Sequence, residues 1–165
     1  MINYYGFETQ AELYLFTHEV AVAFGKDDEQ RITNSNKMML ETMCAETRFG
    51  EEEDNTATTG IGIPQFDPIA FVDIQKFSDE YAQLLWNNWK IDFKLLHIEQ
   101  IRYNGKLAII CMRMKYARVE EAIPSSRDER ASYWIDNYNI GGAGTIEHFL
   151  SNSKFILGDE IIGFK

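Results

Sequence analysis

Glu46 is the residue whose place in the sequence most directly suggests chemistry. It follows an apolar helical stretch and precedes a loop rich in Thr and Gly that returns at Gln65. Partial burial and the negative end of a helix both favour a protonated carboxyl, so we expect a raised pKa for Glu46. Such a carboxyl can donate a proton to a leaving glycosidic oxygen. Spacing alone still favours a glutamate that merely ends its helix.

Other reactive residue types lack suitable neighbours. Cys44 and Cys111 lie within apolar segments and are expected to be buried thiols, without a nearby His to activate Cys44. The three histidines are scattered, so no metal site is predicted. The Gly-rich stretches at 60–62 and 141–144 lack the rest of a nucleotide-binding fingerprint. Trp134 is expected in the core rather than on a sugar face.

Helical signals dominate the chain. Thr9, Asp67 and Ser126 are expected helix N-caps, and a second helix is expected to begin at Asn34 or Ser35 and end near Thr47. Apolar residues on nearly every side predict a buried central helix over 106–119. Further helices are expected over 81–89 and 145–150.

The predicted fold class is mainly α, of an α+β lysozyme-like type: a helical bundle around a buried central helix. Alternating Ile with Thr and Gly indicates a small β-like insertion near residues 50–65. The 165 residues favour one domain, with an N-terminal helical segment over 1–35, a core over 36–152 and a tail over 153–165.

The charge balance restricts the partners. With 16 basic and 26 acidic residues, the formal net charge is −10, which disfavours binding to nucleic acid or to anionic membranes. No apolar run approaches the ~20 residues that span a bilayer, and no signal peptide is recognised at the N-terminus. We therefore expect synthesis in the cytoplasm and no membrane insertion.

Three short motifs resemble one known group of proteins. Glu46-Thr47-Arg48-Phe49-Gly50 followed by Thr59-Gly60-Ile61-Gly62-Ile63-Pro64-Gln65 is similar to the lytic transglycosylase and goose-type lysozyme pattern. Asn137-Tyr138-Asn139-Ile140-Gly141-Gly142 resembles the Tyr-Asn-x-Gly stretch of the same family. A wider pattern resembles small bacteriophage proteins assigned to this group; it consists of Ile63-Pro64-Gln65-Phe66-Asp67-Pro68-Ile69-Ala70-Phe71 and of the stretch from Tyr133-Trp134 to Gly144-Thr145. The resemblance covers roughly residues 36–152. Thr47 stands where Ser is commoner, and Pro64 stands where Met is usual.

The resemblance implies roles for individual residues. Glu46 would be the general acid and later the general base. The substrate-binding residues implied by the motifs are Gln65, Tyr138, Thr59, Gly62 and Asn139. No cofactor and no metal are implied.

A second carboxylate would change the mechanism. Glycosidases usually use two carboxylates, whereas lytic transglycosylases use one, because the substrate's N-acetyl oxygen or 6-hydroxyl does the second task. Asp54 is the loop candidate for a lysozyme-like second role, and the order Glu46, Asp54, Thr59 faintly resembles that of certain phage lysozymes. The one-carboxylate mechanism is preferred.

The expected function is cleavage of the MurNAc-β-1,4-GlcNAc bond of peptidoglycan by a phage lytic transglycosylase or lysozyme. The expected partners are glycan strands of the cell wall and, for a virion-associated enzyme, phage virion or tail proteins. The alternative, from a different class, is a non-catalytic structural or adaptor protein of a phage virion or tail that keeps a lysozyme-like fold.

Overall fold

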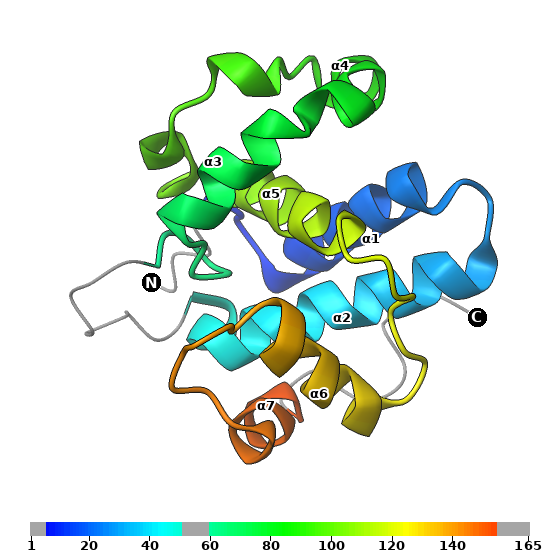
Figure 1. Ribbon diagram of the computed structural model, residues 1–165, viewed down its shortest axis with the longest axis vertical. Coiled ribbons are helices and arrows are strands. Elements are labelled where there is room, and N and C mark those ends of the chain that lie inside the picture. The colour runs from blue at the N-terminus through cyan, green and yellow to red at the C-terminus, as the bar shows by residue number, and fades with distance from the viewer. Residues whose placement is uncertain (1–5, 51–59, 155–165) are drawn as a thin grey trace.

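The computed structural model describes residues 6–50 and 60–154, which are mainly helical (Figure 1). The α-helices are α1 (Gln10–Gly25), α2 (Glu29–Thr47), α3 (Pro68–Lys76), α4 (Ala82–Trp89), α5 (Gly105–Ala117), α6 (Arg127–Asn137) and α7 (Ile146–Ser153). Four short 3₁₀ helices connect them: η1 (Arg48–Gly50), η2 (Ser78–Tyr81), η3 (Phe93–Leu95) and η4 (Ile98–Ile101).

The three predicted N-caps are confirmed. The hydroxyl of Thr9 accepts the N–H of Glu12 at 3.1 Å, and the carboxylate of Asp67 accepts the N–H of Ile69 at 2.6 Å. The Ser126 hydroxyl accepts the N–H of Glu129 at 3.3 Å. Each cap satisfies a backbone donor that the first turn of a helix leaves unpaired, which is why these short polar residues mark the helix starts.

The predicted start of the second helix is wrong. α2 begins at Glu29 rather than at Asn34 or Ser35, because the Asp28 carboxylate accepts the N–H of Arg31 at 2.9 Å and acts as its N-cap. The first turn of α2 is polar and largely exposed, so it carries no apolar periodicity.

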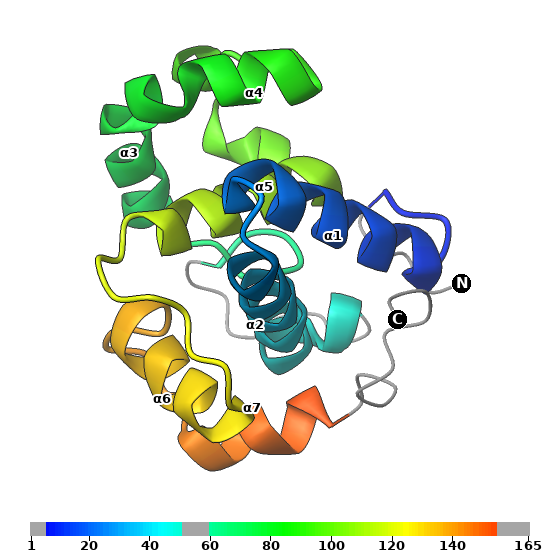
Figure 2. The same ribbon diagram turned by 90° about the vertical axis from the view of Figure 1, so that its right-hand side faces the viewer.

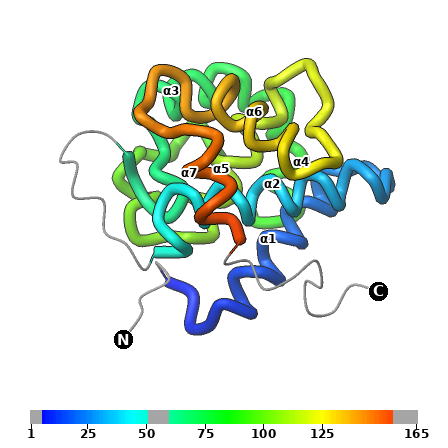
Figure 3. Tube along the Cα trace, turned by 90° about the horizontal axis from the view of Figure 1, so that it is seen from below, coloured from blue at the N-terminus to red at the C-terminus, as the bar shows by residue number. Residues whose placement is uncertain are grey.

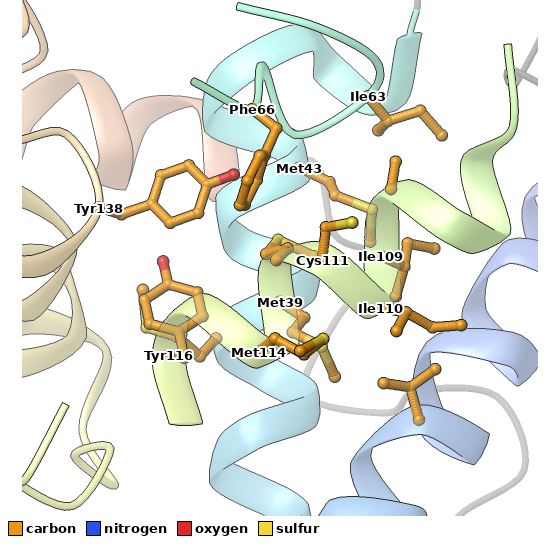
Figure 4. Packing of buried hydrophobic residues seen from close by; sticks show 14 of the residues in the cluster. Met39, Met43, Ile63, Phe66, Ile109, Ile110, Cys111, Met114, Tyr116 and Tyr138 are labelled. Carbon is orange, nitrogen blue, oxygen red and sulfur yellow. The ribbon is translucent and has the colours of Figure 1, made fainter. Parts of the chain in front are cut away.

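Helices α1, α2 and α5 form the centre of the molecule, with α3 and α4 on one side of it and α6 and α7 on the other (Figures 1 and 2). The predicted central helix is confirmed as α5, whose residues 107–114 are all buried. Its side chains meet methionines of α2, including Met39 and Met43 (Figure 4). One hydrophobic core contains side chains from Phe7 to Phe149.

Helices α6 and α7 are fastened to α2. Arg130 of α6 forms a buried ion pair with Glu41 of α2, with Nε–Oε2 and Nη2–Oε1 distances of 2.6 and 2.7 Å. Helix α7 packs against α2 as well (Figure 3). Cys44 Sγ donates to the carbonyl of Asn152 at 3.0 Å. The C-terminal half of α2 is therefore held between the core and the α6–α7 pair.

The predicted β-like insertion is not seen as strands in the described part of the chain. Residues 51–59 lie outside the described residues, and residues 60–66 form a tight turn closed by one antiparallel bridge between Ile61 and Phe66. The two hydrogen bonds of that bridge measure 3.1 and 2.8 Å. None of the helices described is long and apolar enough to cross a membrane.

Candidate functional site

Glu46 lies in the last turn of α2, where its side chain is partly exposed between two buried neighbours, Ala45 and Thr47. The indole Nε1–H of Trp134 donates to Glu46 Oε1 at 3.2 Å. Trp134 is buried, as predicted for a core residue, so this hydrogen bond reaches the carboxylate from the protein interior.

Helix α7 fixes the position of Trp134. The Trp134 ring stacks on His148, with centroids 6.3 Å apart and planes at 22°, and packs against Phe149 at 5.2 Å. His148 Nε2 lies 2.8 Å from the carbonyl oxygen of Ala45. Because a carbonyl only accepts, Nε2 carries the proton and satisfies one of the unpaired carbonyls at the end of α2.

The turn at 60–66 is seated on the end of α2. Thr47 Oγ1, which is fully buried, donates to the carbonyl of Ile63 at 2.8 Å and accepts the N–H of Gly50 at 2.9 Å. Gly62 has φ +74°, and a Cβ there would lie 2.8 Å from the carbonyl oxygen of Ile101. Only glycine fits at this position without strain. Gly62 thus shapes the turn.

Gln65 has its side chain folded over its own turn. Its Nε2 donates to the carbonyl of Gly62 at 3.0 Å, and the side chain fills the space in which a Cβ on Gly60 would stand. Gln65 Oε1 is buried and has no hydrogen-bond partner. This buried acceptor is the polar group of the turn that remains to be satisfied.

Tyr138 contacts the turn rather than open solvent. It is 6% exposed, and its hydroxyl donates to the carbonyl of Pro64 at 2.8 Å. Its ring stacks on Tyr116 at 5.3 Å and meets the edge of Phe66 at 6.4 Å (Figure 4). Burial, followed by the charge of Glu46, raises the pKa of Tyr138 well above its ordinary value. Its geometry is that of a residue that holds the turn in place.

Asn139 supports Trp134 from the neighbouring loop. A Cβ on Gly142 or on Gly144 would collide with the Asn139 amide, and one on Gly144 would also lie 2.3 Å from the indole ring. Asn139 Nδ2 is buried without a hydrogen-bond partner. Gly142 is therefore required for close packing against Asn139, and Gly144 for close packing of the loop onto Trp134, the residue that contacts Glu46.

Lys115 is a site residue that the sequence analysis missed. Its Nζ donates to the carbonyl of Tyr138 at 2.8 Å and lies 4.1 Å from the centre of the Tyr138 ring. Burial lowers the pKa of Lys115, while the charges of Asp67 and Glu46 raise it. Its one signal in the sequence is that it is a charged residue in a helix that is otherwise apolar on nearly every side.

Two predicted residues cannot be placed. Asp54, the candidate second carboxylate, and Thr59 lie outside the described residues. Besides Glu46, the described acid that raises the pKa of Lys115 is Asp67, whose carboxylate caps α3.

The alternatives to acid chemistry receive no support from the geometry. Both thiols are buried, and burial raises the pKa of Cys111. Within residues 6–50 and 60–154, no group of three His, Cys, Asp or Glu side chains is arranged to hold a metal ion.

Comparisons with known proteins do not identify a family. A scan against protein-family models found no match, and searches of curated proteins and of solved structures found none either.

Proposed function

We propose that this protein is a peptidoglycan-cleaving glycosidase of the lytic transglycosylase type, with Glu46 as its general acid and base. The observation that carries the proposal is the position of Glu46. Its carboxyl is partly exposed at a helix end, bonded from the interior by Trp134, and lies beside a turn that Thr47 and Tyr138 hold in place. A proton donor needs this combination of access to substrate and fixed orientation.

The proposed mechanism uses one carboxyl. The protonated Glu46 donates its proton to the glycosidic oxygen between MurNAc and GlcNAc, and the C1–O bond breaks. GlcNAc leaves with a free 4-hydroxyl, and positive charge develops at C1 of MurNAc. The Glu46 carboxylate then accepts the proton of the MurNAc 6-hydroxyl as that oxygen attacks C1, which yields a 1,6-anhydro ring.

The remaining residues support this chemistry. Gln65 closes the turn beside Glu46 through the bond from its Nε2 to the carbonyl of Gly62, and it acts as a positioning residue in this proposal. Lys115 acts as a positive charge close enough to Glu46 for the two charges to interact. Tyr138, Gly62 and Asn139 act as positioning residues in this proposal. The partners would be glycan strands and, for an enzyme carried on a particle, phage virion or tail proteins.

A second candidate function is a structural or adaptor protein of a phage particle with a lysozyme-like fold. The observation in its favour is that the Tyr138 hydroxyl and the Gln65 amide nitrogen both bond to backbone carbonyls within the fold. Residues that resemble a sugar-binding motif would then serve packing alone.

Mass spectrometry of the digestion products separates these functions. Purified peptidoglycan from several hosts is incubated with the wild-type protein, and the soluble muropeptides are weighed. The proposal predicts 1,6-anhydro products, which are one water lighter than hydrolysis products. Products with an ordinary reducing end would indicate a lysozyme with a second carboxylate or a bound water. No release from any wall would favour the structural protein.

A further inference from the structure

A cavity of about 300 Å³ lies away from Glu46, at the opposite end of α2. Its walls are the first two turns of α2, the C-terminal end of α5 and the segment 119–123. Asn34 Nδ2 donates to the carbonyl of Ile123 at 2.9 Å, which fastens this segment to α2. The volume is at the lower end of the range for small-molecule sites.

Arg113 of α5 lines this cavity with an unsatisfied positive charge. It is 4% exposed, and its Nε and Nη1 are buried without a hydrogen-bond partner. The guanidinium lies 4.9 Å from the centre of the Phe24 ring, and it forms no ion pair with a carboxylate of the described residues. A buried guanidinium is ordinarily paired and hydrogen-bonded, because its desolvation is costly.

A second guanidinium adds to the positive charge at this cavity. Arg31 also lines the cavity and, together with the stronger effect of burial, lowers the pKa of Arg113 to about 10. Two like charges at one cavity leave a preference for an anion. A carboxylate satisfies this preference well, since its two oxygens match the paired N–H groups of a guanidinium.

The mouth of the cavity carries the opposite charge. Glu120, Glu121 and Asp28 line it and are exposed, and the Asp28 carboxylate is already bonded to the N–H of Arg31. A polyanion would be repelled by this acidic mouth. A molecule with a carboxylate at one end and an ammonium group at the other would complement both parts.

We propose that this cavity binds a small zwitterion of amino-acid or dipeptide size, with its carboxylate on Arg113 and its ammonium group facing Glu120 and Glu121. The site is independent of the glycosidase proposal, because Glu46, Trp134 and Gln65 do not line the cavity. A carboxylate in the cavity would place a compensating negative charge beside the buried Arg113 guanidinium.

Isothermal titration of the full chain tests this site, with L-alanyl-L-alanine as the probe at fixed ionic strength. We expect saturable binding of one dipeptide per chain. Alanyl-alanine amide, which lacks the carboxylate, is expected to bind at least about tenfold more weakly. Lack of saturable binding of the dipeptide, or equal binding of the amide, would overturn the proposal without any variant being needed.

Variants locate the binding. Arg113→Met should weaken dipeptide binding at least about tenfold, whereas Arg118→Met, which removes a guanidinium outside the cavity, should leave it unchanged. Glu121→Gln should weaken binding of the dipeptide but not of its N-acetyl derivative, which has no ammonium group. Undiminished binding by Arg113→Met, or equal effects of Glu121→Gln on both ligands, would contradict the assigned orientation.

Discussion

At the scale of single residues, the indole of Trp134 links the proposed acid to the hydrophobic core. The ring is packed between α7 side chains and the glycine-rich loop, and its N–H holds one oxygen of Glu46. Composition and spacing could identify Glu46 as a candidate and Trp134 as a core residue. They could not pair the two, because the contact joins positions 88 residues apart.

Trp134→Phe tests this link. Phenylalanine keeps an aromatic ring in the core but loses the N–H, so cleavage should fall roughly tenfold to a hundredfold, as expected for one hydrogen bond to a charged group. The matched control is Trp89→Phe, which removes an indole hydrogen bond to the exposed Glu19. Initial rates of glycan cleavage measure both variants. Equal losses in the two would contradict a role for Trp134 in holding the acid.

Lys115→Met should change the pH dependence of cleavage. The positive charge of Lys115 favours the ionised form of Glu46, so its removal favours the protonated form. A general acid loses activity as pH rises through its pKa, so the alkaline limb of the rate profile should move to higher pH. A limb that stays in place, or moves to lower pH, would show that Lys115 does not act on the acid.

At the scale of elements, three helix N-caps could be predicted from the sequence, whereas the N-cap Asp28 and the contacts between distant segments were missed. The caps at Thr9, Asp67 and Ser126 could be predicted, because each side chain bonds the backbone a few residues away. The start of α2 could not be predicted from apolar periodicity, since its first turn faces solvent. The Ile and Gly alternation at 60–63 produces a turn rather than strands among the described residues, because contacts with Thr47 and Tyr138 decide its shape.

Gly62→Ala tests how tightly the 60–66 turn is seated. Gly141 is the matched control, because it has nearly the same φ, +72° against +74°, but nothing within 4 Å of an added Cβ. Both alanines incur the cost of a left-handed backbone, about 1–2 kcal/mol. Only the Cβ of residue 62 would also press on the Ile101 carbonyl. Urea unfolding should therefore show a larger loss of free energy of unfolding for Gly62→Ala. Equal losses of free energy of unfolding in the two variants would mean that the turn shifts to accommodate the added Cβ and is not tightly seated.

At the scale of the whole molecule, the mainly helical fold and its buried central helix could be predicted, because the apolar pattern of α5 is visible in the chain itself. The surroundings of the charged residues in α5 could not be predicted in the same way. The sequence carries no signal of what surrounds Arg113 and Lys115 in that apolar helix, since their neighbours come from distant parts of the chain.

Stability should fall at alkaline pH. Burial is the largest cause of a raised pKa at three tyrosines of the core, Tyr116, Tyr133 and Tyr138, and at the partly buried Tyr81, with Tyr133 raised to about 12. The unfolded chain releases these protons near pH 10 and the folded chain at higher pH, so stability is full below pH 10 and is lost above it. Lys115 and Arg113 have lowered pKa values and act in the opposite sense, but the tyrosines outnumber them.

Thermal unfolding measured between about pH 9 and 12, with tyrosinate absorbance followed in parallel, checks this prediction. The midpoint should decrease as pH rises, and tyrosinate should appear together with unfolding. Ionisation of the buried tyrosines near pH 10 without loss of the fold would contradict the burial of their hydroxyls.

The central claim is that Glu46 carries the chemistry, and the rate of peptidoglycan cleavage by Glu46→Gln tests it most directly. Glutamine keeps the shape of the side chain and an oxygen for the Trp134 hydrogen bond but cannot donate the acidic proton. Glu147→Gln is the matched control, because Glu147 is an exposed glutamate of α7. The account predicts a loss of about 10²–10⁴-fold for Glu46→Gln and none for Glu147→Gln. A Glu46→Gln protein that folds and cleaves at the wild-type rate would contradict it.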